Sequence, residues 1–225
     1  MNRSMHRTAW MTFAALLSLT GPVAGPWTST AKADVVPIDG YGASYGEWSA
    51  RWWQWILSIP AATNPNFEGD CAQGQVDRVW FLASLFEAAA VTRHCTVPAH
   101  MPILVPVINA ISFRPQGQAT VLNLRQGAKD LIDAVDPASL LVTVDGEAVV
   151  IHRATSPTFT VVNPPKVILP RGWLTLPGNS DTLVSDGYWV LLEPLAPGSH
   201  EIRVKGEIYD LAYWVDVTYK LTVTP

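Results

Sequence analysis

The chain has 225 residues, of which 48% are hydrophobic and 15% are charged, and its formal net charge is −4. This composition is typical of a globular protein with a sizeable core, and it excludes an intrinsically disordered chain. The negative charge argues against electrostatic attraction to nucleic acid or to anionic lipid.

Residues 1–33 have the pattern of a secretory signal peptide. A positively charged start is followed by a short apolar run and then by an A-x-A arrangement that ends at Ala33, which predicts cleavage after that residue. The alternative is an uncleaved N-terminal anchor. No later hydrophobic run is long enough to span a bilayer. We therefore expect an exported protein, secreted or periplasmic, whose mature part is a single domain of residues 34–225.

The first predicted element of the mature chain is a helix between Ser44 and Pro60. Ser44 and Glu47 have the spacing of a capping box, in which each residue satisfies a free backbone N–H group of the first turn. Pro60 ends the helix because it cannot donate a backbone hydrogen bond. The segment contains four of the ten tryptophans of the chain, so it is either a ligand site or a piece of core.

The helical period favours the core for most of these rings. At 100° per residue, one apolar face holds Trp48, Trp52, Trp55, Ile56 and Ile59. A helix that is apolar over most of its circumference is normally buried. Trp53 lies off this face, so we expect it to be the most accessible ring. The remaining stripe is polar and contains Glu47, Arg51 and Gln54, with Glu47 and Arg51 at the i,i+4 spacing of an ion pair.

A polar loop follows at residues 61–76. Cys71 in this loop and Cys95 are the two cysteines of the chain, and two cysteines in an exported protein predict a disulfide. The alternatives are a reactive thiol and a pair of metal ligands. Amides gather in the same loop, including Asn64, and Asn109 interrupts a later apolar segment. A buried asparagine needs partners, so these amides either tie the loop to the sheet or line a polar pocket.

The rest of the chain predicts mostly strands. The expected elements are a buried strand at 78–84, a helix or loop at 86–95, an edge strand or bulge at 102–113, a strand at 119–125, a second short helix at 127–136 that ends before Pro137, and a hairpin at 139–154 around Asp145-Gly146. Short strands separated by turns continue to the end of the chain. We therefore expect a mainly β fold, an antiparallel Ig-like or jelly-roll-type β-sandwich with a Trp-rich N-terminal helix.

Several segments resemble a family of uncharacterised exported bacterial proteins. They are "YGASYGEWSARWWQW", "NP" at 64–65, "GQ" at 74–75, "VWFL" at 79–82, "RHCTVP" at 93–98 and "DGYWVLLEPLAPGSH". The last of these is also similar to the late strands of Ig-like domains. The resemblance implies export and a β-sandwich, and it implies no activity.

Signatures of common hydrolases are missing, including G-x-S-x-G and H-E-x-x-H. A disulfide would bring Asp70 near His94, which gives a candidate acid–base pair, and Glu47 is a further catalytic candidate. His94 and His100 are weak metal candidates, and we predict no cofactor. The alternative for all of these residues is an ordinary loop or surface role, so the sequence does not decide whether the protein is an enzyme.

The favoured function is therefore binding of a small molecule, a glycan or a protein partner. Trp173 lies in a Gly- and Pro-rich loop and is the best candidate for an exposed stacking ring. The other candidate binding residues are Arg51, Gln54, Asn64 and Asn109. Two alternatives stay open, an exported hydrolase with its site under the 61–76 and 93–100 loops and a structural envelope or surface protein.

Overall fold

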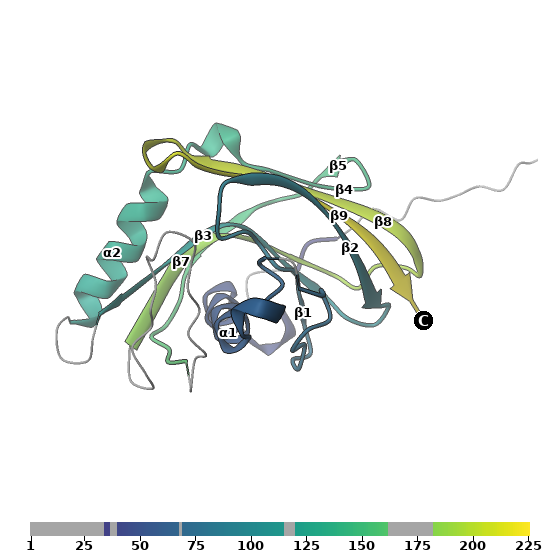
Figure 1. Ribbon diagram of the computed structural model, residues 1–225, viewed down its shortest axis with the longest axis horizontal. Coiled ribbons are helices and arrows are strands. Elements are labelled where there is room, and N and C mark those ends of the chain that lie inside the picture. The colour runs from purple at the N-terminus through teal and green to yellow at the C-terminus, as the bar shows by residue number, and fades with distance from the viewer. Residues whose placement is uncertain (1–33, 37–39, 68, 115–119, 162–181) are drawn as a thin grey trace, which may run out of the picture. The chain divides into compact units, whose positions relative to one another are not determined.

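The described part of the chain is a β-sandwich with two α-helices (Figure 1). The computed structural model describes residues 34–36, 40–67, 69–114, 120–161 and 182–225. All of these belong to one unit, Ala31–Pro225. The predicted signal peptide and Trp173 lie outside the described residues.

The helices are α1 (Tyr45–Ser58) and α2 (Val121–Asp133). The strands are β1 (Trp80–Phe81), β2 (Ala89–Pro98), β3 (Ile103–Arg114), β4 (Leu141–Val144), β5 (Glu147–Ala148), β6 (His152–Thr155), β7 (Thr182–Leu192), β8 (Gly198–Ile208) and β9 (Tyr213–Thr224). Short 3-10 turns occur at Gly40–Gly42, Ala61–Thr63, Pro137–Ser139 and Tyr209–Leu211.

The strands form two sheets, one with the order β1-β3-β7-β6 and one with the order β2-β9-β8-β4-β5. Most neighbours are antiparallel, as expected. Two pairs are parallel instead, β1 with β3 and β2 with β9. The second pair joins an early strand to the last one over ten residue positions. The sequence pattern did not predict it, because the alternation of a strand does not specify the direction of its partner.

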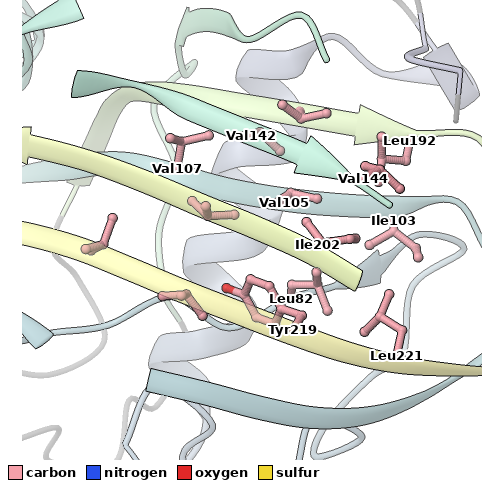
Figure 2. Close-up of a cluster of buried hydrophobic side chains, with 14 of the residues drawn as sticks. Leu82, Ile103, Val105, Val107, Val142, Val144, Leu192, Ile202, Tyr219 and Leu221 are labelled. Atoms are coloured by element: carbon pink, nitrogen blue, oxygen red, sulfur yellow. The ribbon is translucent and has the colours of Figure 1, made fainter. Parts of the chain in front are cut away.

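Alternate residues of β7 show how the layers pack. Val190 and Leu192 belong to the core between the two sheets, whereas Trp189 and Leu191 belong to a second core under α1. The four-stranded sheet is therefore covered on both faces, by the five-stranded sheet on one side and by α1 on the other (Figure 1). Figure 2 shows the first core, with Val105 from one sheet and Ile202 and Leu221 from the other.

Two segments differ from their predicted structure. Residues 86–95 were expected to be helix or loop, but most of them lie in β2. Residues 119–125 were expected to be a strand, but they contain the first turn of α2, where the Thr120 side chain caps the helix by accepting from the Asn123 N–H. Leu124, Ala128 and Ile132 then form its buried face. This face repeats every four residues, the spacing that indicates a helix.

The predicted disulfide between Cys71 and Cys95 is confirmed. It fastens the 61–76 loop to β2, an edge strand of the five-stranded sheet. We expect the double variant Cys71→Ser/Cys95→Ser to lose about 3–4 kcal/mol of stability, the loop-closure value for a separation of 24 residues. It should also aggregate more readily, because a covering loop protects a strand edge. Thermal unfolding and light scattering test this, and a melting temperature equal to that of the wild type would contradict it.

Candidate functional site

A cavity of about 380 Å³ lies beside α1. Its wall comes from six parts of the chain, namely α1, the loop at 66, the loop at 84–88, β3, α2 and the turn between β8 and β9. The lining residues include Trp52, Trp53, Asn66, Leu85, Phe86, Ala88, Asn109, Ala110, Leu131, Leu211 and Tyr213. Most of these side chains are apolar, and a mostly apolar concave surface with a few polar groups is the usual form of a small-molecule site.

Hydrogen bonds fix helix α1 at both of its ends. The predicted capping box is present, with the Ser44 N–H donating to Glu47 Oε2 at 2.8 Å and the Glu47 N–H donating to Ser44 Oγ at 3.3 Å. At the other end, Asn64 Nδ2 donates to the carbonyl oxygens of Ile56 at 2.7 Å and Ile59 at 3.1 Å. These contacts hold the helix in the position from which Trp52 and Trp53 line the cavity.

The four indoles of α1 are buried, which confirms the core interpretation. Three of them donate from Nε1 to a backbone carbonyl: Trp48 to Gly40, Trp52 to Leu82 and Trp55 to Gln73, at 2.8–3.0 Å. Trp53 was expected to be the most accessible ring. It is only 6% exposed, yet its Nε1 has no partner among the described residues, and this ring lines the cavity.

Asn109 reaches this side of the sheet because β3 contains a bulge. The register between β3 and β7 shifts between Pro106 and Ile108, as the prolines of the segment predicted. After the shift Asn109 lies opposite Gly187, and both are on the α1 face of the sheet that Trp189 also occupies. Without the bulge, the alternation of a strand would place Asn109 in the core between the sheets.

Three side chains hold the 84–88 segment by donating hydrogen bonds to carbonyl groups of the segment or to that of Ala83, the residue before it. Tyr213 Oη donates to the Leu85 carbonyl at 2.7 Å, and Tyr219 Oη donates to the Ala83 carbonyl at 2.5 Å. Arg93 Nη2 donates to the Ser84 carbonyl at 3.0 Å. Burial raises the pKa of both tyrosines, so their hydroxyl groups remain protonated donors at neutral pH.

The predicted polar stripe of α1 does not face the cavity. Hydrogen bonds from Ser44 hold the pKa of Glu47 below its usual value, so this exposed carboxylate is a cap and not a proton donor at neutral pH. The Arg51 guanidinium carbon lies 4.4 Å from the centroid of the Trp48 ring, and Arg51 Nη1 lies 3.7 Å from Asp77 Oδ2. The expected ion pair with Glu47 is therefore replaced by a pair with Asp77, which lies outside the helix. Gln54 Nε2 donates to the Thr160 carbonyl at 2.9 Å.

Asn64 is fully buried, and both ends of its amide are used within the chain, because Oδ1 also accepts from the Asn66 N–H at 2.9 Å. The sequence left open whether Asn64 ties down the loop or lines a pocket, and the structure shows the first. The amide of Asn64 is therefore used within the chain, and a binding role for this residue stays a prediction. Asn66, which belongs to the same polar loop, was not selected although it does line the cavity.

Asp70 and His94 line a different groove of about 670 Å³ between the loop and β2. Both side chains are exposed, and no hydrogen bond joins them to each other; Asp70 Oδ1 instead accepts from the Ala72 N–H at 2.9 Å. His100 lies in the turn after β2 and does not line this groove. Within the described ranges, no group of three or more His, Cys, Asp or Glu side chains is placed to hold a metal ion.

Comparison of the chain with protein-family models, with curated proteins and with solved structures found no match. None of the helices in the described ranges is long and apolar enough to cross a bilayer. A proposal for function therefore depends on the geometry of the cavity and of the groove.

Proposed function

We propose that the protein is an exported binding module whose cavity beside α1 holds a small molecule. The observation that carries this proposal is a mostly apolar cavity whose lining includes Trp53 and Asn66, two residues with buried polar side-chain atoms that have no partner among the described residues. Buried polar atoms are almost always bonded in folded proteins, so unbonded ones on cavity-lining residues are suited to a ligand. Trp80, Trp189 and Arg93 also have an unbonded buried nitrogen, and they do not line this cavity. The volume lies at the lower end of the range for small-molecule sites.

Export is supported by two features of the chain. The N-terminal pattern is typical of a signal peptide, and structural disulfides are typical of proteins from oxidising compartments. The resemblance to exported bacterial proteins agrees with both.

The glycan and hydrolase alternatives have less support. Stacking on a sugar needs an exposed ring face, and the tryptophans of α1 are buried; among the described residues, Trp214 is the exposed tryptophan, at 40%. A hydrolase at Asp70 and His94 needs proton transfer between positioned groups, and no hydrogen bond joins these two side chains. Both alternatives remain predictions, as does a purely structural role.

Two variants, each with one alanine replaced by tryptophan, test the binding site. Ala88 lines the cavity, whereas Ala90 is two residues further along and does not, and both are exposed. We expect the uncharged dye Nile red to bind the wild-type protein with a rise in fluorescence. Ala88→Trp should weaken this binding by about 10-fold or more, which is about 1.4 kcal/mol, because the ring narrows the cavity. Ala90→Trp should leave the affinity within about twofold of the wild type.

Circular dichroism of both variants checks that the fold is retained. The proposal fails if Nile red does not bind the wild-type protein, or if the two variants weaken its binding equally.

A further inference from the structure

Three buried polar atoms on two residues that line the cavity indicate which ligand group could bond to them. Trp53 Nε1 and Asn66 Nδ2 are hydrogen-bond donors, and Asn66 Oδ1 is an acceptor; none has a partner among the described residues. Asn66 is only 3% exposed. An unbonded buried polar group costs the fold about 1–3 kcal/mol, so these atoms oppose folding when they remain unbonded.

Asn64, two positions away, shows what a structural amide looks like in the same loop. It is equally buried, and its side chain makes three hydrogen bonds to backbone groups of Ile56, Ile59 and Asn66. The side chain of Asn66 makes none, although its backbone N–H is bonded to Asn64. The difference between the two asparagines is that Asn66 lines the cavity.

The charges around the cavity limit the ligand further. Glu87 is the charged side chain that lines it, and no Lys, Arg or His of the described residues does so. The nearby Arg93 donates to the carbonyl groups of Pro65 and Ser84. A carboxylate or phosphate in the cavity would lose its hydration without meeting a cation, which is strongly unfavourable.

We propose that the ligand is a largely apolar molecule without an anionic group that carries one amide or a similar donor–acceptor group. This inference rests on the proposed function. The carbonyl of such a group would accept from Trp53 Nε1 or Asn66 Nδ2, and its N–H would donate to Asn66 Oδ1. The hydrocarbon part would contact the apolar wall, which includes Leu85, Phe86 and Leu131.

Octyl compounds that differ only in the polar group test the ligand class. We expect isothermal titration calorimetry at pH 7 to show octanamide binding at least about 10-fold more tightly than octanoate. Asn66→Leu replaces the amide with an apolar group of similar shape, and it should remove this preference.

The melting temperature is a second measurement, and its expected value would be different if Asn66 had a structural role. Asn66→Leu should keep or raise the melting temperature, because it removes buried unbonded atoms. The matched variant Asn64→Leu breaks three hydrogen bonds and should lower the melting temperature by about 5–10 °C.

The possible failures can be told apart. Equal binding of octanamide and octanoate, with Nile red still bound, would overturn the ligand class and leave the binding function intact. An Asn66→Leu variant that is destabilised as much as Asn64→Leu would also overturn it. If neither Nile red nor any octyl compound binds, the proposed function fails as well.

Discussion

Replacing Trp52 with alanine is expected to lower the free energy of unfolding by about 3–5 kcal/mol. The ring is fully buried and packs edge-on against Trp53, Trp55 and Trp189, with centroids 5.1–6.2 Å apart. Its Nε1 also donates to the Leu82 carbonyl at 2.8 Å, so the substitution leaves both a large void and an unbonded carbonyl group. Trp52 is thus one of the rings that join α1 to the four-stranded sheet, with Trp48 and Trp55 packing on Phe81 of β1.

Thermal and urea unfolding measure this loss, which corresponds to a fall of about 10–15 °C in melting temperature for a chain of this size. Trp214 is 40% exposed on β9, so Trp214→Ala is the matched control and should cost less than about 1 kcal/mol. Trp52→Phe should recover part of the stability because it refills most of the void. Equal stabilities of Trp52→Ala and Trp214→Ala would contradict the packing of α1.

Replacing Asp186 with alanine is expected to cost a similar amount, about 3–5 kcal/mol. This carboxylate on β7 is fully buried, accepts from Arg153 Nε at 3.0 Å and accepts from Thr155 Oγ1 at 2.9 Å. Arg153 on β6 also pairs with Asp133 of α2 at 2.6 Å. The substitution would therefore leave the Arg153 guanidinium, whose side chain is 30% exposed, with Asp133 as its one carboxylate partner, and it would weaken the contact between β6, β7 and α2.

Asp216 is the control, because it pairs with Arg203 and Lys205 at the surface of the five-stranded sheet. Asp216→Ala should change stability by less than about 1 kcal/mol, as is usual for exposed pairs. The double variant Arg153→Met/Asp186→Leu should be more stable than Asp186→Ala, because apolar side chains refill the volume of the buried carboxylate and its partner. Unfolding curves of the four proteins test this, and an Asp186→Ala loss no larger than that of Asp216→Ala would contradict the buried pair.

Local patterns predicted the helix α1 and the late strands well. The capping box, the apolar face of tryptophans and the Asp145-Gly146 turn each depend on residues that are a few positions apart. The turn has positive φ at both residues, 51° and 88°, which is the backbone that this dipeptide favours. The disulfide needed only the cysteine count and the expectation of export.

The same patterns failed where an element depends on its neighbours. In β2, exposed residues alternate with half-buried ones, and full burial begins only at Cys95 and Val97. The apolar pattern of its first residues was therefore weak. The start of α2 has β-branched and aliphatic residues that favour a strand locally, and burial of Leu124 and Ala128 against Val184 outweighs that tendency.

The candidate site was predicted only in part. Trp53 was identified as the unusual ring of α1 and Asn109 as an unusual polar residue of its strand, and both line the cavity. Glu47, Arg51 and Gln54 were selected because they are polar on an apolar helix, but each has a partner in the fold and lies elsewhere. Leu131 and the turn between β8 and β9 carry no local signal for a ligand site.

The sequence by itself determined the mainly β fold, the buried helix and the disulfide, because these follow from period, composition and short-range capping. Only the tertiary structure decided which polar groups are bonded, since their partners lie far along the chain, as Tyr219 and Ala83 do at a separation of 136 positions. It thereby separated Asn64, whose amide is fully used, from Asn66, whose amide is not. That separation depends on which backbone groups the folded chain brings within hydrogen-bond distance, and no pattern of neighbouring residues specifies it.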